Sequence, residues 1–556
     1  MNCALRVSPV PSWVSEQSLG AKLLASGVVF EAVFKKKKRV FAVVTFSCPE
    51  HKEEAQRLIS QGLVDLGFKE SKAPASITVR DAEYVALSRT KEKRMKRLRD
   101  DEESDKPKKP KLPVEVKDVR DFTTPLWKLA YEEQLVLKKE QVEKKLRFMA
   151  KEMTKTYRDD PEVVLPAYPD ELLCSIDEVY ACPEPVGYRN KMAFTIAKGF
   201  HSDLVVGFQA GKFLESGGSV IAAEPDECIN IPQVSKDIAK LVQNFLCSSS
   251  QKVHFRSGND VESSGYWRAL LVRVSSKNRE MLVLIQVDPK GFIAQTNAEE
   301  ELIALKHEFV QVLQNWAKAQ QESNSYSIVS ILWQEYSGCS NAAPFDLPSE
   351  ILYGQSYLTD SLCGMNFRVQ ADSFFQVNNS SAEILYNLAG SWLNLDPSRS
   401  VLLDVCCGTG TIGLLLSSKC KKVLGLEVVP AAIQDAKFNA ELNGVGNCEY
   451  ILGKCEDTLD DALLQLVGPE DQVCGVVDPP RSGLHKSVIR ALRSCSQLKE
   501  LVYISCNYNA MPNDILALIR PDKGKRGGDA FNVDKVSIVD LFPHTEHCEV
   551  IVKLSR

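Results

Sequence analysis

The sequence has neither the cysteine spacing of a metal site nor a long apolar run. Its 17 cysteines are scattered, apart from the adjacent pair Cys406 and Cys407, and none forms a Cys-x-x-Cys pair. Zinc ribbons and thioredoxin-type sites need that spacing, so neither is indicated and no metal is expected. No apolar run reaches the roughly 18 residues that span a bilayer, and residues 1–20 lack a secretory apolar stretch. We therefore expect no secretion and no membrane partner, and a reducing compartment.

Positive charge is not in excess either. The chain has 68 Lys and Arg against 73 Asp and Glu, which gives a formal net charge of −5. A nucleic acid would therefore be bound by local basic patches rather than by overall charge. Basic clusters at residues 91–99 and 106–111 flank an acidic block at residues 100–103. Because such blocks do not fold on their own, residues 86–125 are expected to form a charged disordered linker.

The basic clusters of this linker are open to three interpretations. They suit a nuclear localisation signal, an RNA tether or simply a solvated connection. Residues 1–20 do not have the Arg-rich amphipathic pattern of a mitochondrial transit peptide. The expected location is therefore the cytosol, the nucleus or both.

The first 85 residues are expected to form a small α+β module. Residues 39–46 resemble the central strand motif of an RNA-recognition motif, in which aromatic residues stack on bases. The matching residues are Arg39, Phe41, Ala42, Val44 and Phe46. Val40 replaces a glycine and Val43 replaces an aromatic residue. Two interpretations stay open: a module that binds RNA, and a fold of this type kept for packing or protein contacts.

Residues 126–370 are expected to hold a helical segment and an α+β central domain that binds RNA. Residues 128–158 have a helical pattern with heavily charged faces. Strand patterns follow at residues 190–197, 204–208, 269–274, 281–287 and 328–333, with a helix at residues 298–321. Residues 371–556 differ, because from residue 400 strand and helix patterns alternate. Strands are expected at residues 401–405, 422–427, 449–452, 473–477 and 500–505, with a final pair at 534–542 and 548–554.

This alternation predicts an α/β fold with a doubly wound, mostly parallel sheet, whose ligands bind at the carboxyl ends of the strands. A glycine-containing loop, Asp404-Val-Cys-Cys-Gly-Thr-Gly410, follows the first of these strands. Glu427 ends the next strand, where one carboxylate can accept from both hydroxyls of a ribose. The loop lacks the third glycine of a dinucleotide site. The pattern resembles that of class I S-adenosylmethionine-dependent methyltransferases.

Asp478-Pro-Pro-Arg481 ends a later strand. Amine-methylating enzymes place an aromatic residue after such a segment, whereas here Arg481 follows. Methylation at pyrimidine C5 needs a thiolate that adds to C6 and a base that later removes the C5 proton. Cys506, directly after a strand pattern, can supply the thiol. Residues 540–549 supply candidate bases: Glu546, Glu549 and two histidines.

Four motifs in order resemble the RNA uracil-C5 methyltransferase family over residues 124–556. They are Phe374-Phe-Gln-Val-Asn378, Asp478-Pro-Pro-Arg481, Ser505-Cys-Asn507, and Phe-Pro-x-Thr-x-His-x-Glu ending at Glu549. A segment of the family's central domain is matched by Tyr188-Arg-Asn-Lys191. The resemblance implies S-adenosylmethionine as the cofactor and tRNA as the partner, with uridine 54 of the T loop converted to 5-methyluridine. It leaves rRNA as an alternative substrate, and the clustered cysteines of iron–sulfur members are absent.

The resemblance also implies roles for individual residues. Cys506 would be the nucleophile and Glu549 the proton acceptor. The implied cofactor contacts are Gln376, Asp404, Cys406, Gly408, Gly410, Thr411, Glu427 and Asp478. The implied RNA contacts are Phe375, Asn378, Arg481 and Asn507. Arg481 would meet RNA or order its loop, and Phe374 and Phe375 would line the base or belong to the core. The competing hypothesis is a non-catalytic RNA-binding protein that keeps this fold; no oligomeric state is indicated.

Overall fold

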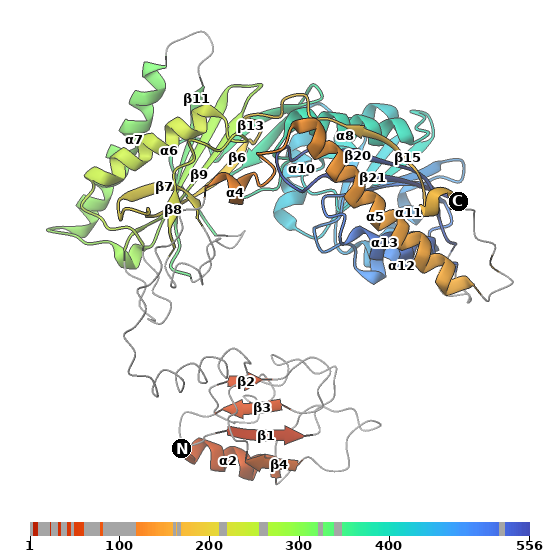
Figure 1. Cartoon of the computed structure of the whole chain (residues 1–556), viewed down its shortest axis with the longest axis horizontal. Helices are drawn as coiled ribbons and strands as arrows, with labels where there is room; N and C mark the ends of the chain where they lie inside the picture. The colour runs from red at the N-terminus through yellow and green to blue at the C-terminus, as the bar shows by residue number, and fades with distance from the viewer. Residues whose placement is uncertain are drawn as a thin grey trace. The chain divides into compact units, whose positions relative to one another are not determined.

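The computed structural model describes part of the chain, which divides into two compact units, Met1–Leu112 and Pro113–Arg556 (Figure 1). The described residues are 4–8, 23, 32–34, 42–45, 49–60, 78–81, 118–158, 163, 168–210, 220–254, 265–320, 326–338, 347–521 and 529–556. The two units are described separately.

The first unit contains a four-stranded antiparallel sheet in the order β2-β3-β1-β4. Its strands are β1 (Ala4–Ser8), β2 (Ala32–Phe34), β3 (Ala42–Thr45) and β4 (Thr78–Asp81), and its described helix is α2 (Pro49–Ser60). Val44 on β3 and Ala55 on α2 are both buried. β3 lies within residues 39–46, where the sequence predicts a strand, and residues 39–41 and 46 lie outside the described residues.

The second unit begins with residues that the sequence assigned to the linker. Residues 118–125 are ordered, and α4 (Arg120–Thr123) lies among them. Val119 is buried in the same core as Cys228 and Thr124 is fully buried, so apolar contacts fix this segment. The expectation that the linker extends to residue 125 is therefore wrong at its end, and residues 86–117 lie outside the described residues.

The central domain is a seven-stranded sheet in the order β12-β11-β10-β9-β6-β7-β8, with helices α6 and α7 packed on it (Figure 1). Its elements are β6 (Lys191–Lys198), β7 (Leu204–Gln209), β8 (Ala222–Ala223), α6 (Gln233–Ser248), β9 (Trp267–Ser275), β10 (Glu280–Val287), α7 (Ala298–Ala319), β11 (Ser327–Glu335) and β12 (Glu350–Gly354). Trp267 and Trp333 are buried between sheet and helices, which explains the continuous apolar runs of β9 to β11. A two-stranded sheet, β13 (Tyr357–Leu362) and β14 (Met365–Gln370), follows.

The C-terminal part is an eight-stranded sheet in the order β17-β16-β15-β18-β19-β21-β20-β5. Its strands are β15 (Ser400–Val405), β16 (Lys422–Glu427), β17 (Cys448–Leu452), β18 (Gln472–Val477), β19 (Leu498–Ser505), β20 (Asn532–Val539) and β21 (Glu549–Ser555). Its helices are α8 (Asn379–Trp392), α9 (Thr411–Leu416), α10 (Pro430–Leu442), α11 (Cys455–Leu466), α12 (Lys486–Ser494) and α13 (Met511–Ile519). The winding reverses between β15 and β18, and ligands bind at such a switch point.

Two elements from before the central domain complete this C-terminal part. Helix α5 (Tyr131–Tyr157) packs its apolar stripe into the core beside α13, and β5 (Ile176–Tyr180) pairs in parallel with β20. Figure 1 shows α5 lying along the C-terminal part, away from α6 and α7. From the sequence, this helix was predicted to belong with the central domain. A helical pattern shows which face of a helix is apolar, but it does not show against which sheet that face packs. Among the described residues, no helix is long and apolar enough to span a membrane.

Candidate active site

The glycine loop that follows β15 is held in an unusual backbone conformation. Cys406, Gly408 and Gly410 all have positive φ, at 63°, 54° and 77°. For Cys406 this is the left-handed region, which non-glycine residues seldom adopt. The buried Asp404 carboxylate fixes the turn by accepting from the backbone N–H of Gly413 at 2.8 Å. Asp404 thus orders the loop from beneath it.

Glu427 lies across from this loop at the end of β16. One carboxylate oxygen accepts from the N–H of Gly408 at 3.1 Å, and the other accepts from Val428 and Val429 at 2.8 and 3.0 Å. A side chain added at Gly408 would meet nothing within 4 Å, so the backbone borders open space there. The half-buried carboxylate can accept from the ribose hydroxyls of S-adenosylmethionine, and the open glycine turn lets the ligand lie against the protein backbone.

Strand register brings the candidate nucleophile and base together. In the antiparallel pair β19–β21, Ser505 lies opposite Val550, so the next position outward places Cys506 opposite Glu549. Directly opposed side chains point to the same face with Cβ atoms about 5 Å apart. Asp478 follows β18, the parallel neighbour of β19, and therefore reaches the same edge of the sheet. Two segments 43 residues apart thus meet through pairing that their motifs do not specify.

The resting site disfavours the Cys506 thiolate. Burial and, less strongly, the carboxylates of Glu549 and Asp478 together raise the pKa of this thiol to about 11, against the opposing effect of Arg481. At pH 7 a thiol with that pKa is ionised in about one molecule in ten thousand. The surroundings of Cys506 therefore do not lower its pKa.

The carboxyl group of Glu549 is buried and interacts with the half-buried carboxyl group of Asp478. Burial raises the pKa of Glu549 well above its ordinary value, the charge of Asp478 raises it further, and Arg481 lowers it. Burial likewise raises the pKa of Asp478 to about 7. Like charges at close range resist simultaneous ionisation, so the charge of Asp478 disfavours the anionic form of Glu549. Arg481 favours the anionic form of both Cys506 and Glu549, the forms that a nucleophile and a base require.

The charge of Glu549 gives a testable pH dependence of Cys506. Because a neighbouring carboxylate raises the thiol pKa, the substitution Glu549→Gln is expected to lower it. The rate of iodoacetamide alkylation at Cys506, followed from pH 6 to 11 by peptide mass spectrometry, should then rise at lower pH than in the wild type. Glu546→Gln, an exposed position of the same turn, is the control. A shift to higher pH in Glu549→Gln would contradict this arrangement.

Comparisons with known proteins decide the family. Residues 349–556 match the family model described as tRNA (Uracil-5-)-methyltransferase. The chain is 34% identical to tRNA (uracil-5-)-methyltransferase homolog A of Mus musculus over 446 residues, which is 79% of this chain and 69% of that protein. It is also 34% identical to homolog B of Danio rerio, over 78% of this chain and 86% of that protein.

The chain belongs to the tRNA (uracil-5-)-methyltransferase family. The family indicated by the sequence motifs is thereby confirmed. The fold also resembles the crystal structure of Pyrococcus abyssi tRNA (uracil-54, C5)-methyltransferase in complex with S-adenosyl-L-homocysteine, with a TM-score of 0.53 and 21% identity. That match covers 77% of this chain and 84% of the other, and it supports the mixed α/β methyltransferase fold.

In this family member, Gln376 is positioned by the central domain and by a tyrosine that the sequence did not single out. Asn190 donates through its side chain to the Gln376 carbonyl at 2.8 Å and through its backbone to Val377 at 2.9 Å. Tyr386, buried on α8, forms a hydrogen bond with the Gln376 side chain and lies in the field of Asp478 and Glu549. Its apolar neighbours in sequence make Tyr386 look like an ordinary core residue.

Three of the implied RNA contacts have their side chains engaged within the protein. Phe375 is 5% exposed and packs against Phe367, whereas Phe374 is 70% exposed. Asn378 is buried and accepts from the N–H of Ser381, which caps α8. Asn507 donates to the Arg481 carbonyl at 2.9 Å. Direct RNA contacts by Phe375 and Asn378 are therefore not supported by their positions, and Asn507 instead orders the loop that carries Arg481.

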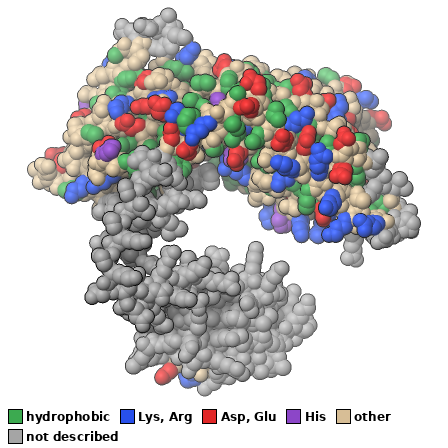
Figure 2. All heavy atoms as spheres, in the orientation of Figure 1, with side chains coloured by type: hydrophobic (Ala, Val, Ile, Leu, Met, Phe, Trp, Pro, Cys, Tyr) green, Lys and Arg blue, Asp and Glu red, His purple; other side chains and the backbone are tan. Residues whose placement is uncertain are grey.

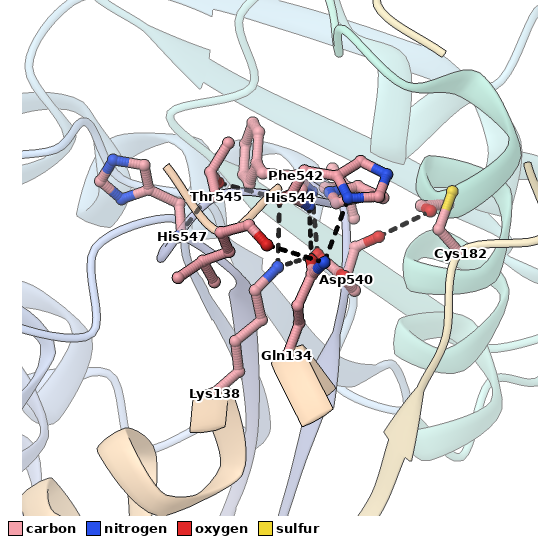
Figure 3. Close-up of polar contacts among 12 residues, drawn as sticks. Gln134, Lys138, Cys182, Asp540, Phe542, His544, Thr545 and His547 are labelled. Atoms are coloured by element: carbon pink, nitrogen blue, oxygen red, sulfur yellow. Dashed lines mark hydrogen bonds and ion pairs between the residues drawn. The ribbon is translucent and has the colours of Figure 1, made fainter. Parts of the chain in front are cut away.

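The turn that precedes Glu549 is anchored by α5, as Figure 3 shows. Lys138 donates to the Asp540 carboxylate at 2.6 Å and to the Phe542 carbonyl at 3.1 Å, and both charged side chains are fully buried. Gln134 accepts from the N–H of His544 at 2.8 Å. The Tyr131 hydroxyl donates to the other oxygen of Asp540 at 3.0 Å and accepts from the N–H of Cys182 at 2.8 Å. A helix from the start of the second unit thus fixes the turn carrying the candidate base.

Breaking this buried ion pair should cost much of the stability. Lys138→Met would leave the Asp540 carboxylate buried without its partner, which typically costs about 3–5 kcal/mol. The free energy of unfolding, measured by urea denaturation, should fall by that order. Lys139→Met on the same helix is the control, because Lys139 is exposed, and it should change stability by less than about 0.5 kcal/mol. Equal losses in the two variants would contradict the assigned role of Lys138.

Proposed function

We propose that this protein transfers a methyl group from S-adenosylmethionine to C5 of a uridine in tRNA, forming 5-methyluridine. The observation that carries the proposal is the register that sets Cys506 opposite Glu549, beside Asp478 at the switch edge of the sheet. Family membership and the names of the relatives support the same reaction. A protein that only bound RNA would have no need to bury a carboxylate beside a thiol.

The cofactor would lie along the loops after β15, β16 and β18. Glu427 would accept from the ribose hydroxyls, and the open backbone at Gly408 would lie against the ligand, whereas Gly410 packs closely against Tyr450. Gln376 and Asp478 would face the methionine end. When bound, S-adenosylmethionine supplies an electrophilic methyl group on its sulfonium. Asp404, Cys406 and Thr411 would shape this site chiefly by holding the loop.

The residues of the chain then carry out an addition and an elimination. The Cys506 thiolate adds to uracil C6, and the electron pair of the C5–C6 bond moves to C5 and O4. C5 would then take the methyl group from the sulfonium, whose sulfur would keep the electron pair of the broken S–CH3 bond and leave as the thioether S-adenosylhomocysteine. The Glu549 carboxylate then takes the C5 proton, the C5–C6 double bond re-forms, and the sulfur leaves C6 as thiolate. Arg481 would stabilise the negative charge at each stage, as it does for Cys506 and Glu549 in the resting site.

We propose uridine 54 of the T loop as the target, with rRNA as the alternative. A base in a folded loop must leave its stack to reach Cys506, at a cost of a few kcal/mol. The four-stranded sheet and helix of the first unit would form an RNA-recognition-type module, although the strand-motif aromatics lie outside the described residues. The basic segments at residues 91–99 and 106–111 would add phosphate contacts and would suit a nuclear or cytosolic location.

Nucleoside mass spectrometry would test the reaction. Unmodified tRNA and rRNA transcripts would be incubated with the protein and S-adenosylmethionine carrying a labelled methyl group, then digested to nucleosides. The expected result is label in 5-methyluridine from tRNA, lost when uridine 54 is replaced by cytidine. Label only in an N-methylated base, or no label with Glu427 and Cys506 intact, would overturn the proposed function.

A further inference from the structure

A basic groove lies between α12 and α13, beside the loop that carries Arg481. It has a volume of about 1020 Å³ and is lined by the polar residues Ser482, Asn513, Lys486, Arg490, Arg493 and Arg520, over a floor that includes Leu484 and Ile489. In Figure 2, Lys and Arg side chains gather over the end of the second unit where α5, α12 and α13 lie. Because the whole chain has a net charge of −5, this basic patch is a local feature and not a result of overall composition.

Arg493, a buried cation of this groove, is engaged within the protein, since it donates to the Ala517 carbonyl at 2.8 Å, whereas two other cations are available to a ligand. Lys486 and Arg490 are exposed and form no hydrogen bond or ion pair with any residue that the structure describes. The acidic lining residue, Asp514, is 5% exposed and is used internally, since it accepts from the N–H of Leu484 at 2.7 Å and from the Tyr503 hydroxyl at 2.8 Å. Lys486 and Arg490 therefore present positive charge to solvent, and the acid that lines the groove among the described residues is engaged by other partners.

The groove is lined in part by the loop that carries Arg481. Ser482, at its rim, directly follows Arg481, whose charge acts on both Cys506 and Glu549. Two hydrogen bonds fix the connecting loop: Asn507 donates to the Arg481 carbonyl, and the N–H of Leu484 donates to Asp514. A polymer with one residue in the catalytic pocket would therefore meet this groove on one side of that residue.

We infer that the α12–α13 groove binds the phosphodiester backbone of the RNA strand next to the target uridine. Exposed Lys and Arg side chains, with Ser and Asn donors between them, are the groups that contact phosphates without reading sequence. The groove would hold the RNA in place while the neighbouring uridine is turned into the pocket. This inference rests on the proposed function, because it takes the ligand to be the RNA substrate.

Charge reversal would test the groove. The double variant Lys486→Glu/Arg490→Glu changes two exposed residues outside the catalytic machinery. Its Kd and KM for an unmodified tRNA transcript should rise tenfold or more, because attraction to phosphate becomes repulsion. The slope of log Kd against log salt should fall by about two, one for each lost phosphate contact. kcat at saturating RNA and affinity for S-adenosyl-L-homocysteine should stay within twofold.

The matched control is Lys419→Glu/Lys437→Glu. It makes the same change in net charge at exposed positions near α9 and on α10, away from α12 and α13. Its Kd should stay within twofold of the wild type. Equal Kd and salt slope in the two double variants would overturn the groove assignment and leave the surface to another anionic partner. If the wild-type protein does not methylate tRNA, the proposed function fails, and the Kd comparison alone decides the groove.

Discussion

Replacing Cys506 with alanine is expected to abolish 5-methyluridine formation. Without the sulfur there is no addition to C6, and C5 of uracil is then too weakly nucleophilic to take a methyl group. Loss of a catalytic nucleophile typically reduces turnover by roughly 10⁴-fold or more. The measurement is labelled methyl incorporated into tRNA per enzyme molecule, at saturating S-adenosylmethionine. RNA affinity should remain within a few-fold, because Cys506 is uncharged in the resting site.

The control for general thiol loss is Cys247→Ala. Cys247 is an exposed cysteine at the end of α6 in the central domain, and its removal should leave methylation unchanged. Unchanged methylation in Cys506→Ala would refute the addition mechanism while leaving the fold and family untouched. If methylation were lost equally in Cys247→Ala and Cys506→Ala, the loss would reflect a general effect of removing a cysteine rather than a role of Cys506.

The substitution Glu549→Gln should stop the reaction at a later stage. Cys506 can still add to C6 and the methyl group can still reach C5, but the C5 proton has no acceptor. Turnover should fall roughly 10²–10⁴-fold, the usual contribution of a general base. A covalent complex of protein and RNA that already carries the labelled methyl group should accumulate, visible as a shifted band in a denaturing gel.

Glu546→Gln provides a control from the same turn. Glu546 is exposed, whereas Glu549 is 1% exposed and lies on the first position of β21. Glu546→Gln should turn over normally and accumulate no methylated adduct. If the adduct formed in Glu546→Gln and not in Glu549→Gln, the assignment of the base would have to move to Glu546.

The catalytic roles expected of Cys506 and Glu549 came from motifs in the sequence, whereas the strand pairing that sets them opposite each other came only from the structure. The alternation of strands and helices also predicted the C-terminal sheet to within two residues at the ends of β15 to β19. The motifs did not indicate whether each side chain faces the core or the solvent. Phe374 and Phe375 are adjacent and chemically alike, yet one is exposed and the other is in the core, because alternate residues of an extended segment face opposite ways.

The role of Lys138 was not accessible in the same way. A lysine within a run of Lys and Glu is usually on the solvent side of a helix. From the sequence, residues 128–158 were accordingly described as a helix with heavily charged faces. Its position on the stripe Gln134, Lys138, Val142 and Leu146, spaced four residues apart, is the signal that it faces inward. Even that spacing does not identify the partner, since Asp540 lies 402 residues later.

That separation has a consequence for how the protein forms on the ribosome. At about 5–20 residues per second, Lys138 is made roughly 20–80 s before Asp540. During this interval α5 has no acidic partner, and its apolar stripe has no C-terminal sheet to cover it. The central domain, which is continuous in the chain, can fold meanwhile. The nascent chain thus carries an uncovered amphipathic helix until its last residues emerge, and α5 is the segment where a chaperone should bind it.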